Sequence, residues 1–526
     1  MSARASISIP IAAVFLAYLN SLGGVFQFDD YNVIVNNPVV HSFAAWYADL
    51  GGGIRPILKL TYVLNVTSGA GAPGFHLVNL LIHLGNTVMV YYLARALMEG
   101  FFAARGGAGG HAGPTADTPY MSGALAAWNS SGASCAHNTA DTAAVFAALL
   151  FGLHPAQTEA VTYLSGRSSS LAAFFYLASI VVYLRATGSD GAGPGNVEFK
   201  RPNGRRNAVL MYAASPLLFV LAVASKETAI TLPAALLLIE TFGGARRGFK
   251  DALMRQAAHW APGLAMLILL VIHPTHGKLL EYSFDLRGVG VNLLTEINAV
   301  TYLISRLFVL NGMNIDPDLP IVRAWNAGLA LRAVFLAAPI AAGIIMRRRR
   351  PWIILGALWF YLHLAATNSV VPRIDPANER QLYLASAGFF IAAGAQMTIF
   401  FDRVSGAGAG AGLRPQGRRA ITAGVTVFFV MLALFTISRN RCYKSEVALW
   451  EDTRAKSPLK TRVRNNLGYA YYLENRYAEA RAEYLQALKI DPGFKIARKN
   501  LAELPRAGFY GLQPLSATKI NKFVLQ

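Results

Sequence analysis

An acidic pair, Asp29 and Asp30, follows directly after the first apolar stretch of the chain. No charged residue separates Arg4 from Asp29, so the pair lies at the end of a predicted membrane span. Removing a carboxylate from water costs free energy, so an acidic pair at this place indicates a functional site. A carboxylate in this place is suited to take a proton from a hydroxyl group, as a general base does.

Isolated cations also occur at the ends of later apolar stretches. We predict that Arg380, Lys226 and Arg167 neutralise a phosphate on the same face of the membrane as the acidic pair. Further candidate substrate contacts on this face are Arg55, His76, His154, Glu227 and Glu379. Carboxylates and cations on one membrane face fit the transfer of a group from a polyprenyl phosphate.

Each of these residues also has a structural alternative. One aspartate could cap the following segment or pair with Arg55. Arg380 could extend towards the membrane–water interface or pair with Glu379. Lys226 could pair with its neighbour Glu227. Both histidines, His76 and His154, could simply bond to backbone atoms.

The composition requires a membrane protein to hold these residues. Of the 526 residues, 54% are hydrophobic and 14% are charged, whereas soluble proteins are about 25% charged. Uncharged stretches long enough for a bilayer recur, for example at 207–225, 351–372, 381–401 and 420–438. The expected fold is therefore an all-α, polytopic bundle of transmembrane helices.

The net charge of +20 is concentrated in four short loops. They contain Lys200, Arg201, Arg205 and Arg206; Arg246, Arg247, Lys250 and Arg255; Arg347 to Arg350; and Arg403, Arg414, Arg418 and Arg419. Such loops stay on the cytoplasmic side. We therefore predict about eleven crossings, a cytoplasmic N-terminus, a first external loop at 29–74 and an outer-face segment at 274–325. No basic helix with stacking aromatics accompanies these loops, so no nucleic-acid partner is expected.

The chain becomes charged and amphipathic after residue 440. Pro458 and Pro492, and likewise Asn466 and Asn500, lie 34 residues apart, the length of a tetratricopeptide repeat. We predict a transmembrane domain at 1–440, a repeat domain at 441–505 and a tail at 506–526. Such repeats pack as helix pairs and offer a groove to a protein partner.

Several short motifs, taken in order, resemble the transmembrane and tetratricopeptide-repeat mannosyltransferase-like family of the C-type glycosyltransferase superfamily (GT-C). They are Phe28-Asp29-Asp30-Tyr31, Arg55-Pro56, the segments 75–83 and 150–155, Ser165-Gly166-Arg167, Ser225-Lys226-Glu227-Thr228 and the segment 379–384. The resemblance covers nearly the whole chain, including the repeat.

This resemblance implies an eleven-helix GT-C fold and inverting transfer of a sugar, typically mannose, from a polyprenyl-phosphate carrier to a protein Ser or Thr hydroxyl. It makes Asp29 the general base and Asp30 its supporting neighbour; the reverse order stays open. Two alternatives remain: transfer to a lipid or surface glycan, and a non-catalytic scaffold that presents the repeats.

The expected partners are a lipid-linked sugar donor, an acceptor protein or peptide, and membrane lipids. No cofactor is expected and no metal ligands are assigned, although a divalent metal is not excluded. The Ala- and Gly-rich loops favour a bacterial inner membrane with periplasmic repeats; in a eukaryote the membrane would be the endoplasmic reticulum.

Overall fold

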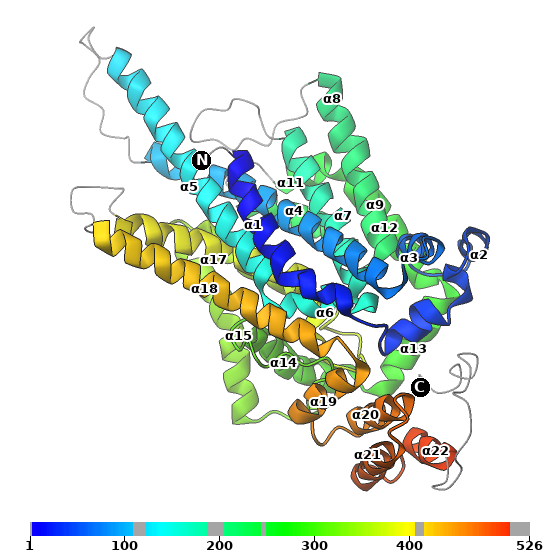
Figure 1. The fold of residues 1–526 in the computed structure, drawn as a ribbon. Helices are drawn as coiled ribbons and strands as arrows, with labels where there is room; N and C mark the ends of the chain where they lie inside the picture. Colours follow the sequence, from blue (N-terminus) through cyan, green and yellow to red (C-terminus); the bar gives the residue numbers. More distant parts are fainter. Residues whose placement is uncertain (1–2, 109–121, 188–203, 243–248, 406–414, 505–526) are drawn as a thin grey trace.

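The computed structural model describes residues 3–108, 122–187, 204–242, 249–405 and 415–504. Helices make up 82% of the structure, and the described residues contain no strand. Figure 1 shows a bundle of long helices with a smaller group of short helices, α19 to α22, at one end. The predicted all-α class is therefore confirmed. The predicted tail, 506–526, lies outside the described residues.

The bundle is built from long apolar helices. They are α1 (Ala3–Tyr18), α4 (Gly71–Ala108), α5 (Ser122–Leu153), α7 (Arg167–Thr187), α12 (Ala257–Ile272), α15 (Ala327–Met346), α17 (Leu382–Ser405) and α18 (Pro415–Cys442). The short helix α8 (Gly204–Val209) continues through a π turn into α9 (Ser215–Ser225), and together they form one further long span. Shorter helices fill the gaps and the outer end: α2 (Phe43–Asp49), α3 (Pro56–Thr67), α6 (Thr158–Val161), α10 (Leu232–Phe242), α11 (Phe249–Arg255), α13 (Pro274–Leu286), α14 (Val289–Arg306) and α16 (Pro351–Ala365). Single 3-10 or π turns, η1 to η8, join several of them.

The structure does not confirm the predicted number of membrane crossings. Seven helices are long and apolar enough to cross, or nine if each of two bent helix pairs is one span. The two remaining apolar helices, α10 and α16, have 11 and 15 residues, and a helix needs about 20 to cross the hydrocarbon core. The chain is a multi-pass membrane protein, but the predicted count of eleven is not confirmed.

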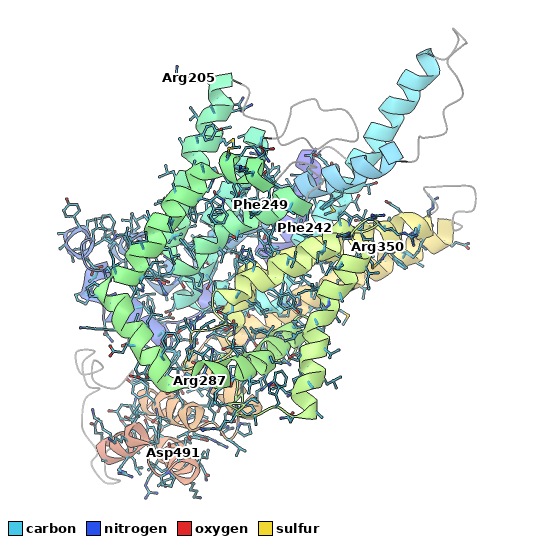
Figure 2. All side chains as sticks on the ribbon, turned by 180° about the vertical axis from the view of Figure 1, so that it is seen from behind. Arg205, Phe242, Phe249, Arg287, Arg350 and Asp491 are labelled. Atoms are coloured by element: carbon cyan, nitrogen blue, oxygen red, sulfur yellow. The ribbon has the colours of Figure 1, made fainter. Side chains whose placement is uncertain are left out.

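The two ends of the bundle differ in what they carry. Figure 2 shows Arg205, Phe242, Phe249 and Arg350, which mark three of the basic loops, in one half of the molecule, and Asp491 of the repeat at the opposite end. The amphipathic helices α13 and α14 lie near the repeat end (Figure 1). The three basic loops thus lie apart from the repeat.

Polar side chains tie the core helices together. Asn79 of α4 donates to the backbone oxygen of Val161 at 2.9 Å, and a ring nitrogen of His83 lies 2.7 Å from the Tyr383 hydroxyl of α17. Small residues allow close packing elsewhere: a Cβ on Gly394 would lie 2.7 Å from the backbone oxygen of Ala143. Helices α4, α5 and α17 therefore form a rigid frame beneath the site.

The repeat consists of α19 (Glu446–Lys456), α20 (Thr461–Leu473), α21 (Tyr477–Ile490) and α22 (Lys495–Glu503). Its core is continuous with the membrane domain, because Tyr163 and Ile315 pack in the same buried cluster as Trp450 and Leu467. Ion pairs reinforce this contact: Lys460 and Arg462 both bind Asp316. The repeat is docked on the bundle.

Candidate functional site

Asp29 lies in a turn that is fixed through its backbone. Its N–H donates to the Tyr163 hydroxyl at 3.0 Å. The preceding residue, Phe28, has a φ of 48°, which non-glycine residues rarely adopt and which is typical of functional sites. The N–H of Phe28 donates to the Glu446 carboxylate of α19 at 2.8 Å. The Asp29 carboxylate is half-buried and accepts no hydrogen bond from the described residues.

Asp30 has a different environment. Its side chain is buried and accepts from the backbone N–H groups of Gln27 at 3.0 Å and Ser165 at 2.7 Å, and also from the Ser165 hydroxyl. Burial raises the pKa of Asp30 to about 7, although these hydrogen bonds oppose the rise. Asp30 therefore joins the loop that follows α1 to η5 (Leu164–Gly166), and the carboxylate of Asp29 is left free.

Lys226 and Arg380 line one pocket of about 40 Å³. Its other polar lining residues are Ser169, Thr228, His363, Thr367, Gln381 and Tyr383. The Lys226 amine donates to Ser169 at 2.7 Å and has no carboxylate partner among the described residues. Burial lowers the pKa of Lys226 well below its usual value, and the charges of Arg380, Arg55 and Arg373 lower it further. An anion in this pocket would relieve that repulsion.

Glu159 orients Arg380. The Glu159 carboxylate accepts from the backbone N–H of Arg380 at 3.1 Å and lies 3.8 Å from its Nε. The side chain of Arg380 keeps 25% of its surface exposed, whereas that of Glu159 keeps 1%. The buried Glu159 thus positions the guanidinium of Arg380, which stays accessible from the pocket.

Arg55 and Glu227 form an ion pair beside the pocket. Arg55 Nε and Nη2 each donate to the Glu227 carboxylate at 2.9 Å. Burial would raise the pKa of Glu227, but the Arg55 guanidinium outweighs it and holds that pKa below its usual value. Glu227 thus binds Arg55 and leaves its neighbour Lys226 free. Arg55 has a φ of 56°, so this pair holds a second strained residue in place.

Arg167 is buried, and its guanidinium is hydrogen-bonded within the protein. Its guanidinium donates to the side chain of Asn79 at 2.5 Å and to the backbone oxygen of Phe75 at 2.9 Å. It also contacts Thr61 at 3.2 Å and lies 4.9 Å from the centroid of the Tyr62 ring. These contacts connect α3, α4 and α7, and Arg167 does not line the pocket of Lys226 and Arg380.

The remaining predicted contacts are also buried. His154 accepts from the backbone N–H of Ala156 at 3.2 Å, and its Nε2 lies 3.1 Å from the backbone oxygen of Leu307. Glu379 accepts from the backbone N–H of Asn314 at 2.6 Å. Neither nitrogen of His76 has a partner in the described part of the chain. A Cβ on Gly24 would lie 2.5 Å from the His76 ring, so a glycine is needed there.

The structure therefore places Lys226 and Arg380 together, with Arg55 and Glu227 beside them, and gives Arg167 and His154 contacts within the frame. Sequence reasoning did not assign Ser169 or Tyr163 to the site. Ser169 had one signal, since it belongs to the serine run that follows Arg167. Tyr163 had none, because tyrosines are common at helix ends.

No group of three or more His, Cys, Asp or Glu side chains that could hold a metal ion occurs in the described segments. Asp29 and Asp30 are adjacent in sequence, but the hydrogen bonds of Asp30 turn its carboxylate towards Ser165. Metal independence stays a prediction.

Comparisons with known proteins show what the chain is similar to. The tetratricopeptide repeat family model matches residues 462–494. Protein O-mannosyl-transferase TMTC4 of Mus musculus is 24% identical over 514 residues, which cover 86% of this chain and 62% of the relative. Protein O-mannosyl-transferase Tmtc3 of Drosophila melanogaster is 24% identical over 545 residues, which cover 91% of this chain and 54% of the relative. The chain thus spans under two thirds of the length of these relatives, and along most of its own length it is similar to the transmembrane and tetratricopeptide-repeat family.

Proposed function

We propose that this chain is an integral-membrane glycosyltransferase. It moves a sugar, mannose by analogy with the names of its relatives, from a polyprenyl-phosphate carrier to a Ser or Thr hydroxyl of a protein. The observation that carries this proposal is the combination of a free, half-buried carboxylate at Asp29 with a cationic pocket at Lys226 and Arg380. We assign the two parts to one site because the charge of Asp29 is among those that act on Arg380.

The two parts of the site divide the reaction. Asp29 takes the proton of the acceptor hydroxyl. At the same time, the oxygen of that hydroxyl attacks the anomeric carbon of the sugar. The bond from that carbon to the phosphate oxygen breaks, and the polyprenyl phosphate leaves with the electron pair. Lys226 and Arg380 stabilise the negative charge that develops on the leaving phosphate. Attack opposite to the leaving group inverts the anomeric configuration.

The other predicted residues hold the site in shape. Asp30 fixes the loop that carries Asp29, and the pair of Arg55 and Glu227 borders the pocket. Arg167 fixes the helices beneath that loop. All these residues lie outside the basic loops, which supports a reaction on the external face. We propose a bacterial inner membrane with periplasmic repeats, or the endoplasmic reticulum in a eukaryote.

The test is transfer in vitro from defined polyprenyl-phosphate sugars to peptides, with wild type and Asp29→Asn. The amide keeps the size of the side chain but cannot take the proton, so turnover should fall at least about 100-fold. Asp285→Asn, on the exposed side of α13, is the matched control and should keep full turnover. Equal turnover of Asp29→Asn and wild type would refute the assigned base. Transfer only to lipid or glycan acceptors would replace the proposed acceptor, and no transfer from any donor would favour the scaffold.

A further inference from the structure

The pocket lined by Lys226 and Arg380 also has polar side chains without charge that the reaction scheme does not use. His363 of α16 and Gln381 of η8 (Glu379–Gln381) both line it, and the two residues are 8% and 9% exposed. Nε2 of His363 and Nε2 of Gln381 have no hydrogen-bond partner in the described part of the chain. A buried polar atom without a partner costs free energy, so a ligand that enters this pocket is expected to supply one.

The ring of His363 is held in one orientation. Its Nδ1 lies 2.7 Å from the backbone oxygen of Trp359, and a carbonyl oxygen only accepts hydrogen bonds, so Nδ1 carries the proton. The ring also packs against the rings of Trp359 and Tyr176, with centroids 4.4 and 5.1 Å away. A further positive charge beside Lys226 and Arg380 would be repelled, which favours the neutral ring. Nε2 of His363 is therefore a hydrogen-bond acceptor.

Gln381 supplies the opposite group. Its Oε1 accepts from the backbone N–H of Asn378 at 3.1 Å, as part of the capping box of η8. This bond uses the oxygen of the amide and leaves Nε2 as a donor without a partner in the described segments. The pocket thus offers one acceptor and one donor beside its two cations. A hydroxyl group matches this pair, because it donates one hydrogen bond and accepts others.

The size of the pocket limits which hydroxyl can reach His363 and Gln381. A pocket of about 40 Å³ has room for about three water-sized groups, because one such group needs about 10–15 Å³. In a sugar phosphate, the hydroxyl nearest to the phosphate is the one on carbon 2, next to the anomeric carbon. With the phosphate bound at Lys226 and Arg380, the hydroxyls farther along the sugar ring lie beyond so small a pocket.

We infer that His363 and Gln381 bind the hydroxyl on carbon 2 of the donor sugar and thereby contribute to the choice of sugar. This inference rests on the proposed polyprenyl-phosphate donor. The hydroxyl donates to Nε2 of His363, and its oxygen accepts from Nε2 of Gln381. A donor without this hydroxyl leaves both nitrogens unpaired and binds more weakly. Carbon 2 is also the position at which mannose and glucose differ, so this pair of residues can distinguish them.

The experiment compares two donors that differ only in this hydroxyl. The full chain in detergent is titrated, without an acceptor, with a short-chain polyprenyl-phosphate mannose and with its 2-deoxy analogue. Wild type should bind the 2-deoxy donor at least about tenfold more weakly, since buried hydrogen bonds are lost. His363→Phe keeps an aromatic ring but has no acceptor, so the ratio of the two affinities should approach one. Gln381→Met keeps the length of the side chain without the donor and should lower the ratio in the same way.

His259→Phe is the matched control for the histidine variant. His259 is also buried, packs against the ring of Tyr183 and lies 2.8 Å from the hydroxyl of Ser215, but it does not line the pocket. The control should therefore keep the wild-type ratio even if its stability falls. An equal loss of the ratio in both histidine variants would indicate general loosening of the bundle and would overturn the assignment.

The outcomes separate the inference from the function on which it rests. Equal or tighter binding of the 2-deoxy donor by wild type would overturn the inference and leave the donor phosphate site intact. A wild-type ratio in His363→Phe would remove His363 from the contact and overturn the inference as well. Binding of neither donor by folded wild type would overturn the proposed function together with the inference. The first comparison uses wild type alone, so it does not depend on the folding of any variant.

Discussion

The ring of Phe28 packs edge-on against the ring of Trp450, with centroids 5.2 Å apart and planes at 82°. Phe28 immediately precedes the proposed base, Asp29, and Trp450 lies in the first repeat helix, α19. The two residues are brought together although they lie 422 positions apart in the chain. The repeat thus supports the strained turn that presents Asp29.

Trp450→Ala is predicted to reduce turnover as well as stability. Removing a buried tryptophan costs about 3–5 kcal/mol, and Phe28 then loses the ring that holds its left-handed conformation. The repeat should become sensitive to protease, and sugar transfer should fall at least tenfold. Tyr477→Ala, an exposed ring on α21, is the control and should change neither. Full turnover in a Trp450→Ala protein whose repeat is digested would show that docking of the repeat does not position Asp29.

Asp30 predicts a specific dependence of stability on pH. Burial raises its pKa to about 7 in the folded protein, so between the unfolded value and pH 7 the folded state binds more protons. Its contribution is therefore fully present at low pH and is lost as the pH rises towards 7, by about 1.4 kcal/mol per unit.

Asp30→Asn should remove this dependence. Its melting temperature should fall less between pH 5 and pH 7 than that of wild type, whereas Asp285→Asn should follow wild type. Parallel curves for wild type and Asp30→Asn would mean that Asp30 ionises normally in the folded protein.

Local patterns in the sequence predicted the all-α class, the repeat and the family resemblance. The 34-residue spacing places Asn466 and Asn500 at equivalent positions of successive repeat units, and the Asn500 amide donates to Asn465, the neighbour of Asn466, at 3.0 Å. The pairing of Arg55 with Glu227 spans 172 positions, and no local pattern reports it. Adjacency instead suggested Glu227 and Lys226, whose side chains the structure directs to different partners.

The number of crossings was not predictable for a related reason. Hydropathy measures how apolar a stretch is, but a bend decides whether it crosses. The segments Asn138–Leu153 and Pro155–Val161 meet at 56°, and Phe249–Arg255 meets Ala257–Ile272 at 74°. At the first break, His154 precedes Pro155, accepts from the backbone N–H of Ala156 and lies near the backbone oxygen of Leu307. At the second break, the side chain of Gln256 donates to Glu240 of α10.

The pair of Arg55 and Glu227 is predicted to be coupled energetically. The side chains keep 35% and 23% of their surfaces exposed, so solvent screens the pair and the coupling should be about 1–2 kcal/mol. It is measured by a double-mutant cycle of Arg55→Gln and Glu227→Gln in unfolding by SDS titration. The exposed pair Arg476 and Glu479 is the matched control, and its coupling should be weaker because solvent screens it fully. Equal couplings would indicate that the pair beside the pocket is no more than a surface contact.

Lys226→Arg tests the charge in the pocket through pH. Burial, and then Arg380, Arg55 and Arg373, lower the pKa of Lys226, so its amine loses its charge at a lower pH than usual. As pH rises through that pKa, wild type should lose kcat/KM for the donor, a quantity that reports the free enzyme. Arginine stays charged, and Lys226→Arg should therefore keep its kcat/KM over the range in which wild type declines.

Lys226→Gln supplies the other limit of this experiment. It carries no charge at any pH, so its kcat/KM for the donor should be low and should not decline with pH. Asp285→Asn should show the wild-type profile. Parallel declines in wild type and Lys226→Arg would assign the titration to another group and remove the amine of Lys226 from phosphate binding. A kcat/KM that stays high with rising pH in Lys226→Arg and is low at every pH in Lys226→Gln ties donor affinity to the positive charge at this position, because size and position are changed in both variants but charge is kept in only one.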